Sequence, residues 1–559
     1  MPLIELIETN LEKKNHTPIW RFPEEKNEFP ISELYDRAIE YAHTFTALGV
    51  EAGDTVGFML NNCSDFVPFL IGLWKINAMA VPLRPHAGSD FDIHAYLNRI
   101  EKSCQFKLII FNDDANEDLI NSWTGLSGRQ GYRRSEFIGI HPVTIKTDFP
   151  SILPSDIAVI QYSSGSTGDP KGVIVTHEMV MNQVRQIDFE RRVAGQDKEI
   201  ESTGSWLPFN HDMGLFIGIL HPLFAWSNNI LASPRYYMYK PKRWFELQSQ
   251  YQVEWNFTTN MAMANSLRSL AQLAPGAIDL SLFYLYLSAE KVSPTILRKC
   301  YEVLKEFNMP EDHFKVGYGM AENTLGAAST KQGKINTVHV CIDENSNTVQ
   351  KTDGHDNNAV EVVSIGSPHI NTTMTVRDEA GNILPEMTLG EICIQGHCVF
   401  PGYHRDEEVS KKALVEGMFK TRDLGFYCNG DLYFYSRKDA MLVVGGRNIA
   451  PEDIEDCAEG MEGFSVGGTA LIEVEQKSVG TNKLVLLVEM EDKRHRLDLT
   501  SERHRIQSEI YQKKGILIST IVFCGKNTIV KTTSGKKRRK AIKETFEKEQ
   551  KALCGNDSL

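Results

Sequence analysis

The stretch "QYSSGSTGDPKGVIVTH", residues Gln161–His177, joins an apolar segment to a loop of small and hydroxyl-bearing residues. The segment that leads into it, "IAVIQY" (157–162), is rich in β-branched and aromatic residues and predicts a short buried strand. Serine and threonine hydroxyls, two glycines and Lys171 follow directly. A strand that opens into such a loop can offer backbone N–H groups, hydroxyls and a cation to a phosphate chain. The stretch therefore predicts a phosphate site at the end of a strand.

This loop differs from the Walker A loop of nucleotide hydrolases, which requires the pattern G-x-x-x-x-G-K-[ST]. Gly165 and Gly168 stand too close together for that pattern, and Gly172 follows Lys171 where a hydroxyl is needed. A plain flexible surface loop could share this composition, but the order of residues is long and specific. A nucleotide hydrolase is therefore disfavoured, and phosphate binding of another kind is favoured.

The chain of 559 residues is too long for one hydrophobic core and predicts roughly three to five domain-sized units. Helical and strand patterns alternate up to about residue 330, as in the helix expected over 31–50 and the strands expected over 54–60 and 106–111, which indicates α/β layers. Beyond 331 the chain has polar turns and a hairpin pattern at 372–396. We expect an α/β fold with a β-rich subdomain and a boundary near residue 436.

Composition narrows the class of protein. A hydrophobic content of 42% and a charged content of 24% are typical of a globular protein. Polar residues and prolines interrupt the most apolar region, Phe66–Leu83, so we expect no membrane span, and the acidic N-terminal stretch leads us to expect no secretion signal. The ten cysteines fit no zinc pattern, and even Cys393 and Cys398 are expected to be reduced thiols. These features together favour a cytoplasmic protein.

The net charge of −13 argues against a nucleic-acid partner. The segment 531–551 departs from this average because it is strongly basic and contains "KKRRK" at 536–540. Two interpretations stay open here: a solvated helix face, or a patch for an acidic partner.

The loop "YSSGSTGDPKGV" resembles the phosphate loop of the adenylate-forming superfamily, which includes acyl-CoA synthetases, luciferases, nonribosomal adenylation domains and fatty acyl-AMP ligases. The resemblance implies an N-terminal domain over 1–436 with layered α/β subdomains and a β-rich subdomain. It further implies a small mobile α+β C-terminal domain over 437–559. The resemblance covers nearly the whole chain, through "LPFNHDMGL" (207–215), "VGYGMAEN" (316–323), "TRDLGF" (421–426), "SRKDAMLVVGGRNIAPEDIE" (436–455) and "KTTSGKKRR" (531–539).

The reaction that the superfamily catalyses activates a carboxylic acid. A free carboxylate is a poor electrophile, so it attacks the α-phosphate of ATP and releases pyrophosphate, and fixed cations stabilise the charge on the phosphoryl oxygens. By resemblance, Glu322 binds Mg²⁺, a hard cation that prefers oxygen ligands. Lys536 would contact the α-phosphate and the substrate carboxylate, which suits a compact ammonium group. Thr167 and His211 complete the residues with an implied catalytic role.

Nucleotide contacts are implied in the same way. Asp423 matches the aspartate that accepts both ribose hydroxyls, and Tyr318 is similar to the aromatic residue that stacks on adenine. The chain departs from the family by placing Arg422 where a glycine is usual, and Asp439 falls at the hinge position. The full implied set of ATP-binding residues is Ser163, Ser164, Gly165, Ser166, Thr167, Gly168, Lys171, Ser288, Ala289, Glu290, Tyr318, Gly319, Met320, Ala321, Asp423, Arg437 and Lys536.

The sequence also gives expectations about which acid is activated and which molecule receives the acyl group. The stretch 253–267 contains no aspartate to pair with an amine, which favours a simple carboxylic acid, and Met261 and Met263 fit an alkyl tunnel or core packing equally. The stretch 335–368 resembles an insertion of fatty acyl-AMP ligases. That resemblance implies acyl transfer to an acyl carrier protein. The alternatives are an acyl-CoA synthetase and an inactive scaffold that binds a partner through "KKRRK".

Overall fold

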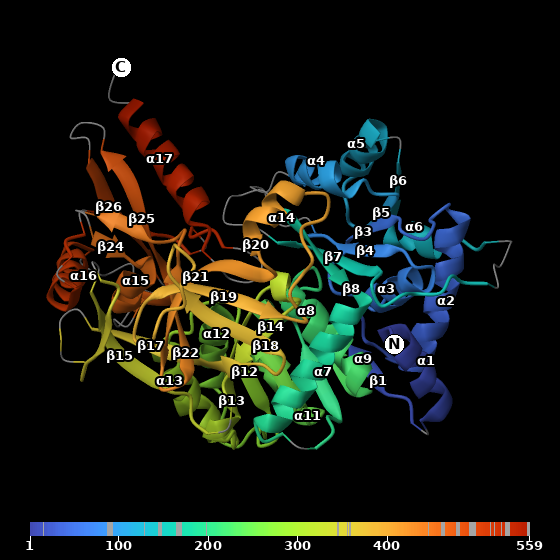
Figure 1. The fold of residues 1–559 in the computed structure, drawn as a ribbon, viewed down its shortest axis with the longest axis horizontal. Helices are drawn as coiled ribbons and strands as arrows, with labels where there is room; N and C mark the ends of the chain where they lie inside the picture. The colour runs from blue at the N-terminus through green and yellow to red at the C-terminus, as the bar shows by residue number, and fades with distance from the viewer. Residues whose placement is uncertain are drawn as a thin grey trace.

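The structure of the chain is a computed structural model. It describes residues 1–14, 16–85, 93–127, 129–142, 148–163, 170–196, 198–331, 333–343, 346–354, 356, 359–444, 447–459, 464–476, 481–490, 499–514, 516–518, 520–526, 528–531 and 537–555. In Figure 1 the N-terminal elements lie on the right, and the last elements of the chain lie at the upper left.

A six-stranded sheet organises the N-terminal part, in the order β6-β5-β3-β4-β7-β8. All neighbours in it are parallel except β7 and β8, which form an antiparallel hairpin. The predicted helix and strands are confirmed: α2 spans Ile31–Ala47, β3 spans Thr55–Met59 and β5 spans Leu108–Phe111. The remaining strands are β4 (Met79–Pro82), β6 (Gln130–Arg133), β7 (Ile157–Ser163) and β8 (Lys171–Thr176).

A larger sheet of sixteen strands forms the centre of the molecule, along the path β18-β19-β21-β22-β17-β14-β13-β12-β11-β9-β10-β1-β2. Its inner strands are parallel: β9 (Ser202–Ser205), β10 (Asn228–Leu231), β11 (Trp255–Thr258), β12 (Tyr284–Leu287) and β13 (Phe314–Gly319). The other half is antiparallel: β14 (Gly326–Ser329), β17 (Val360–Pro368), β18 (Thr372–Arg377), β19 (Gly390–Gly396), β21 (Met418–Cys428) and β22 (Asp431–Arg437).

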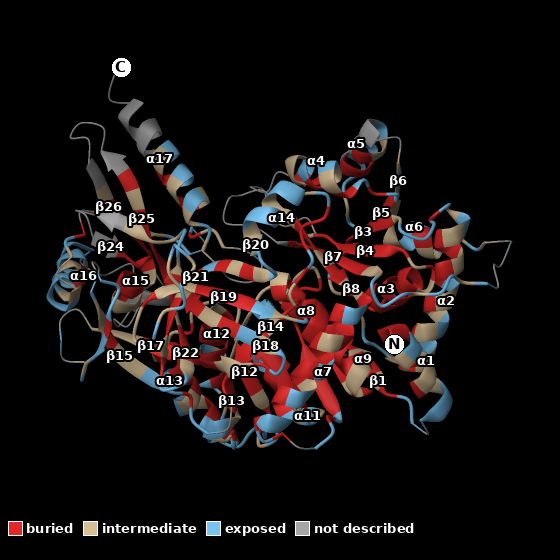
Figure 2. Ribbon diagram, viewed as in Figure 1, coloured by how far each residue is buried: buried red, intermediate tan, exposed pale blue. Residues whose placement is uncertain are grey.

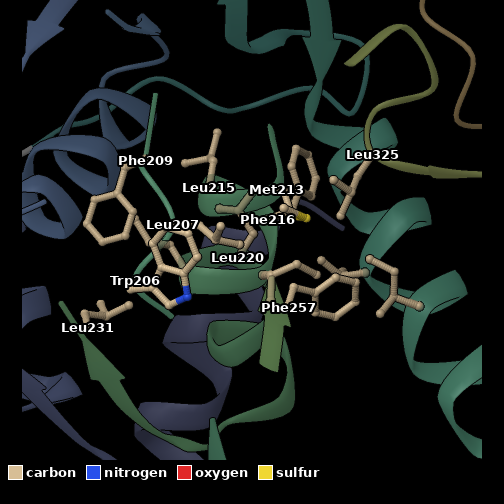
Figure 3. Packing of buried hydrophobic residues seen from close by; sticks show 14 of the residues in the cluster. Trp206, Leu207, Phe209, Met213, Leu215, Phe216, Leu220, Leu231, Phe257 and Leu325 are labelled. Atoms are coloured by element: carbon tan, nitrogen blue, oxygen red, sulfur yellow. The ribbon is translucent and has the colours of Figure 1, made fainter. Parts of the chain in front are cut away.

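Buried helices fill the space around the two sheets. Figure 2 shows α8 (Asp212–Leu215) as buried, and α7 (His177–Val193) as buried on the side that faces the core and exposed on the other. Figure 3 shows why α8 is fixed: Phe209, Met213, Leu215 and Phe216 point into one cluster with side chains from β10 and β11. This apolar packing holds the segment that follows β9 in a single position.

The other elements of this part are α1 (Leu3–Lys13), β1 (Ile19–Phe22), β2 (Asn27–Pro30), α3 (Phe66–Lys75), α4 (Ile93–Cys104), α5 (Glu117–Ser127), α6 (Arg134–Ile138), the π-helix η1 (Phe216–Leu220), α9 (His221–Ala225), α10 (Pro234–Tyr239), α11 (Pro241–Gln250), α12 (Asn260–Leu270), α13 (Pro294–Leu304), β15 (Thr337–Ile342), β16 (Val349–Lys351), α14 (Glu407–Ala413) and β20 (Leu414–Val415). Three short 3₁₀ turns, η2 (Lys305–Phe307), η3 (Glu311–His313) and η4 (Ala321–Asn323), complete it.

The C-terminal part has a core of its own between a three-stranded sheet, β25-β26-β27, and its helices. Its elements are β23 (Leu442–Val444), β24 (Arg447–Ile449), α15 (Pro451–Glu459), β25 (Phe464–Gln476), β26 (Thr481–Met490), α16 (Leu499–Lys514), β27 (Thr520–Cys524) and α17 (Arg539–Gly555). The predicted α/β fold, with a β-rich portion and a small α+β C-terminal part, is confirmed, whereas the boundary after residue 436 and the mobility stay predictions.

Two details refine the sequence expectations. The insertion-like stretch 335–368 forms β15 and β16 off the main path of the sheet, but its end is β17, an integral strand between β14 and β22. The region 66–83 folds as the buried helix α3 and strand β4, and no described helix has the length and apolar character to cross a membrane. Nine cysteines among the described residues carry free thiols, including Cys393 and Cys398.

Candidate active site

Several candidate residues follow parallel strands of the large sheet. The carboxyl ends of parallel strands meet at the same edge, which is where α/β proteins place their ligands. His211 follows β9, Glu290 follows β12 and Glu322 follows β13. The parallel register of β9, β11, β12 and β13 therefore brings segments that are far apart in the sequence to one side of the sheet.

The predicted phosphate loop connects the hairpin β7–β8. Ser163 is the last residue of β7 and pairs with Lys171, the first residue of β8. Ser164, Gly165, Ser166, Thr167 and Gly168 lie outside the described residues, so their expected phosphate contacts stay predictions. The described ends of the hairpin fix where the loop begins and ends.

The segment 400–405 lies along the edge of β8 that does not pair with β7. The Gly172 carbonyl accepts a hydrogen bond from the His404 N–H at 2.7 Å, and Tyr403 forms a bridge with Val173. The Tyr403 hydroxyl donates a hydrogen bond to Oε1 of Glu322 at 2.9 Å. The Lys171 ammonium lies 5.2 Å from the centre of the Tyr403 ring, a cation–π distance. Tyr403 thus joins the phosphate-loop hairpin to the predicted Mg²⁺ ligand.

Glu322 is a carboxylate in a setting that favours a nearby cation. The pKa of Glu322 is raised above its usual value, chiefly by burial and also by the neighbouring charge of Asp212. The Tyr403 hydrogen bond and the charge of Arg437 oppose this rise. Among the described residues, no group of three or more His, Cys, Asp or Glu side chains is arranged to hold a metal alone. Mg²⁺ commonly binds one or two carboxylates together with substrate phosphates, and a bound cation would relieve the cost of burying this charge. The residues present fit the metal on these grounds.

The turn that carries Glu322 depends on close backbone contacts. A Cβ atom on Gly319 would lie 1.8 Å from the Leu325 carbonyl oxygen, so only glycine fits there. Thr324 has a φ of 64°, which is rare for a β-branched residue. Its hydroxyl donates to the Cys398 carbonyl at 2.7 Å, and the Phe400 N–H donates to the Glu322 carbonyl at 2.8 Å. The 3₁₀ turn η4 is therefore held from both sides.

Asp423, the predicted ribose ligand, lies on β21 directly across from Arg437 on β22. Its Oδ1 lies 3.2 Å from Nε of Arg437, and its Oδ2 accepts a hydrogen bond from the Tyr318 hydroxyl at 2.7 Å. Burial, together with the Asp423 charge, raises the pKa of Tyr318 well above its usual value, so the phenol remains a donor. Tyr318, Asp423 and Arg437 thus form one hydrogen-bonded and ion-paired cluster.

Contacts with Asp439 and Lys438 account for the arginine at position 422, where the family usually has glycine. Arg422 has a φ of 62°, a conformation that glycine adopts more easily. Its guanidinium forms a two-point ion pair with Asp439, with Nε 2.9 Å from Oδ2. The Lys438 N–H also donates to the Arg422 carbonyl at 2.8 Å. Arg422 therefore adopts a strained backbone conformation, and its ion pair fixes Asp439 in the segment that follows β22.

His211 forms the N-terminal cap of α8. Its Nδ1 lies 2.6 Å from Oδ1 of Asp212, and that carboxylate oxygen accepts a hydrogen bond from the Met213 N–H at 2.7 Å. A Cβ atom on Gly214 would lie 2.0 Å from the Pro208 carbonyl oxygen, so the glycine of "HDMGL" is required by a close approach. The imidazole is partly exposed, at 26% of its side-chain surface, and stays accessible at the sheet edge.

The strand-end residues Ser288, Ala289 and Glu290 have structural contacts in the chain. The Ser288 hydroxyl donates to the Gly317 carbonyl at 2.8 Å, and Ala289 has a φ of 73°. Oε1 of Glu290 accepts the Met261 N–H at 3.2 Å at the start of α12. Three further predicted residues belong to the Glu322 segment: Gly319 ends β13, Met320 caps the turn η4, and Ala321 begins it.

Lys536 lies outside the described residues, but the segment after it is anchored. Glu455 on α15 lies 2.7 Å from Nζ of Lys537 and also pairs with Arg539, whose Nη2 lies 2.8 Å from Glu452. Burial of Glu455 opposes its charge, but the two cations lower its pKa to about 2. Arg539 is therefore engaged in ion pairs inside the C-terminal part, which is neither of the two roles predicted for "KKRRK".

Two residues of the cluster were not predicted. Tyr403 stands in "FPGYH", 81 positions from Glu322, and no local pattern marks it. Asp212 lies inside the quoted "HDMGL" segment, next to His211, but received no role. Its charge acts on Glu322, so its acidic character beside a predicted catalytic histidine was the available signal.

Comparison with protein families gives two matches. A model described as AMP-binding enzyme matches residues 7–404, and a model described as Disco-interacting protein 2-like, AMP domain, matches residues 441–554. Among curated proteins, the chain is 31% identical over 522 residues to a 4-hydroxyphenylalkanoate adenylyltransferase of Mycobacterium tuberculosis, covering 89% of this chain and 82% of the relative. It is 28% identical to the long-chain-fatty-acid–AMP ligase FadD26 of Mycobacterium marinum, covering 92% of this chain and 91% of that one.

Solved structures show the same fold. A fatty acyl-adenylate ligase structure from work on the enzymes of E. coli and L. pneumophila superposes with a TM-score of 0.85 at 24% identity, covering 99% of this chain and 98% of the other. The McyG A-PCP structure complexed with phenylalanyl-adenylate gives a TM-score of 0.83 at 25% identity, with 98% and 95% covered.

Proposed function

Since the chain belongs to the AMP-binding enzyme family and is an adenylate-forming ligase, we propose that it activates a fatty acid or arylalkanoic acid to its acyl-adenylate. The observation that carries this proposal is the joining of two clusters at one sheet edge. Lys171, Tyr403 and Glu322 form one of them, and Tyr318, Asp423 and Arg437 form the other. Tyr318 lies in β13 and Glu322 in the turn η4 that follows it, so the two clusters are close neighbours.

In the proposed reaction a carboxylate oxygen of the acid attacks the α-phosphorus of ATP. The bond between that phosphorus and the bridging oxygen breaks, and pyrophosphate leaves with the electron pair. Asp423 would accept the ribose hydroxyls and the Tyr318 ring would contact adenine, while Lys171 and the loop 163–169 would receive the phosphates. Mg²⁺, held by Glu322, would neutralise charge on phosphate oxygens. Lys536 would contact both the α-phosphate and the acid.

The acid we propose has no amino group. The helix α12 and the strand before it contain no acidic side chain to pair with an ammonium. The curated relatives named above are an adenylyltransferase of 4-hydroxyphenylalkanoates and a ligase of long-chain fatty acids, which supports an apolar carboxylic acid. Met263 is fully buried in the core, so core packing accounts for it, whereas Met261 is partly exposed at the start of α12.

We further propose that the acyl group passes to the phosphopantetheine thiol of an acyl carrier protein. The thiolate attacks the acyl carbonyl, AMP leaves, and a thioester forms. The support is the stretch 335–368, whose β15 and β16 add to the sheet beside β17. We propose that the parts 1–436 and 437–559 act as two units in these steps. An acyl-CoA synthetase remains the rival, and an inactive scaffold is the third alternative.

One experiment separates these functions. The purified chain is incubated with ATP, Mg²⁺ and a panel of fatty, arylalkanoic and amino acids, and adenylates are identified by mass. We expect adenylates of fatty or arylalkanoic acids, and none with Lys536→Ala, because removal of a charge-stabilising group costs on the order of 10²–10³ in rate. Holo carrier protein and coenzyme A are then supplied in separate reactions. Efficient acyl-CoA formation would contradict the carrier-protein proposal, and no adenylate with any acid would favour the scaffold.

A further inference from the structure

The short helix α10 and the start of α11 carry an exposed surface of unusual composition. Their sequence, "SPRYYMYKPKRW" (233–244), is rich in aromatic and basic residues. Tyr237 and Trp244 are buried and attach the segment to the core, each with 1% of its surface exposed. Met238 and Tyr239 project in contrast, with 47% and 77% exposed. The helix therefore ends in two apolar side chains that contact solvent.

Cations surround these two side chains. The α10 surface, as we define it, consists of the exposed residues Arg235, Met238, Tyr239, Lys240, Lys242 and Arg243. The guanidinium of Arg235 lies 5.8 Å from the Tyr239 ring, and the ammonium of Lys240 lies 5.4 Å from the Tyr236 ring.

Two carboxylates act on this region, and both have partners in the chain. Glu24 accepts the N–H and the hydroxyl of Ser233, each at 2.7 Å, and Glu246 accepts from Arg243 at 3.1 Å. Four cations thus face two engaged carboxylates, in a chain whose net charge is −13. The α10 surface is a local exception to the sign of the whole protein, and its charge is complementary to an anionic partner.

We propose that the α10 surface docks on an anionic phospholipid bilayer. Tyrosine rings and basic side chains are the residues that bilayer interfaces favour, since the ring can enter the headgroup region while the cations contact lipid phosphates. Lysine is depleted in protein–protein interfaces, whereas Lys240 and Lys242 both stand on this surface. Met238 and Tyr239 project from the end of α10, a geometry suited to shallow insertion into a bilayer.

The position of α10 relates membrane docking to the candidate active site. Strand β10 is the neighbour of β9, and both run in the same direction, so α10 and His211 begin at the same edge of the sheet. A bilayer held at this edge would bring membrane-dissolved acyl substrate toward the candidate active site. This consequence rests on the proposed function, but binding to the bilayer does not, so the two can fail separately.

The test measures binding of the full chain to large unilamellar vesicles by flotation. Vesicles of phosphatidylcholine alone are compared with vesicles that contain about one third phosphatidylglycerol, at low and at high salt. We expect binding to the anionic vesicles at low salt, weakening as salt screens the lysines. The Lys240→Gln/Lys242→Gln variant should lower the partition coefficient roughly 10- to 30-fold. Met238→Ser/Tyr239→Ser should lower it at both salt concentrations.

A matched control is Lys102→Gln/Lys107→Gln, which removes the same charge from exposed lysines of α4 and the segment that follows it. In Figure 1, α4 lies at the upper edge of the molecule and α11 at the lower edge. The control should bind like the unchanged protein, and adenylation of a water-soluble short acid should be equal in all variants. No preference of the unchanged protein for anionic vesicles, or an equal loss in the control, would overturn the proposal. Binding to an acidic carrier protein without binding to vesicles would also overturn it and would make a protein the occupant.

Discussion

At the scale of single residues, the hydroxyl of Tyr318 has a contact that its predicted role as an adenine-stacking ring does not require. It donates to Asp423 at 2.7 Å, and Arg437 approaches the other oxygen of that carboxylate at 3.2 Å. A carboxylate held from both sides is oriented before the nucleotide arrives, which lowers the entropic cost of binding. The contact of the hydroxyl with Asp423 is therefore separable from the predicted contact of the ring with adenine.

The Tyr318→Phe variant separates them, because phenylalanine keeps the ring and removes only the donor. A hydrogen bond to a charged group contributes about 1.5–3 kcal/mol, so we expect the KM for ATP to rise at least tenfold with little change in kcat. Steady-state pyrophosphate release measures both constants. The control is Tyr427→Phe, which removes a hydroxyl bonded at 3.0 Å to the Met374 carbonyl. A fall in kcat at unchanged KM would contradict the positioning role.

Glu322 gives a second prediction at this scale. Glu322→Gln keeps an oxygen to accept the Tyr403 hydroxyl but removes the charge that a cation needs. We expect adenylation to fall on the order of 10²-fold or more, and the remaining rate to lose its dependence on Mg²⁺ concentration. Titration of the rate with Mg²⁺ and Mn²⁺ checks this expectation. A variant with the unchanged rate and the unchanged metal dependence would remove Glu322 from the metal site.

At the scale of elements, the sequence predicted strands and helices well where their pattern is local. The strand β7, the helix α2 and the hairpin β18–β19 could be read from periodicity and turn residues. The contact between Tyr403 and Glu322 could not, because it depends on the segment 400–405 lying along the edge of β8. The two-point ion pair of Arg422 with Asp439 could not be predicted either: both residues stood out in the sequence, but no local pattern indicates that their side chains meet.

The helices α15 and α17 are joined by Glu455, and this contact gives a prediction about pH. The pKa of Glu455, ordinarily 4.5, is opposed by burial but lowered to about 2 by Arg539 and Lys537. A carboxyl with a lowered pKa in the folded state stabilises the fold above its unfolded pKa and loses that contribution as pH falls. The free energy of unfolding should thus decrease by on the order of 3 kcal/mol between about pH 4.5 and about pH 2.

Thermal unfolding across this pH range measures the effect. Glu455→Gln leaves the two cations without their counter-charge, so we expect a less stable protein whose stability changes less with acid. The comparison is therefore between slopes and not between absolute melting temperatures. An equal slope in Glu455→Gln and in the unchanged chain would show that other carboxyls dominate the acid response.

At the scale of the whole molecule, a buried ion pair joins the N-terminal and C-terminal parts. Nζ of Lys291, in the segment after β12, lies 2.9 Å from Oδ1 of Asp453 on α15. The hydroxyl of Tyr435 donates to the other oxygen of Asp453 at 2.8 Å. Each charged side chain is only 8% exposed, so the pair is shielded from water and from salt. The placement of α15 thus includes a buried ionic contact with a residue that follows a strand of the large sheet.

The Lys291→Met variant should loosen the C-terminal part from the rest of the chain. It leaves the Asp453 carboxylate buried without its cation, which typically destabilises by about 3–5 kcal/mol. We expect faster proteolytic release of residues 437–559 and a lower melting temperature. The double variant Lys291→Met/Asp453→Asn removes both charges and keeps an acceptor for Tyr435, so it should recover much of the loss. Arg298→Met is the matched control, because it breaks an exposed pair with Glu361 that contributes less than about 1 kcal/mol. If residues 437–559 are released at the same rate from Lys291→Met and from Arg298→Met, the buried pair does not hold the two parts together. The attachment must then come from the apolar and hydrogen-bonded contacts around α15.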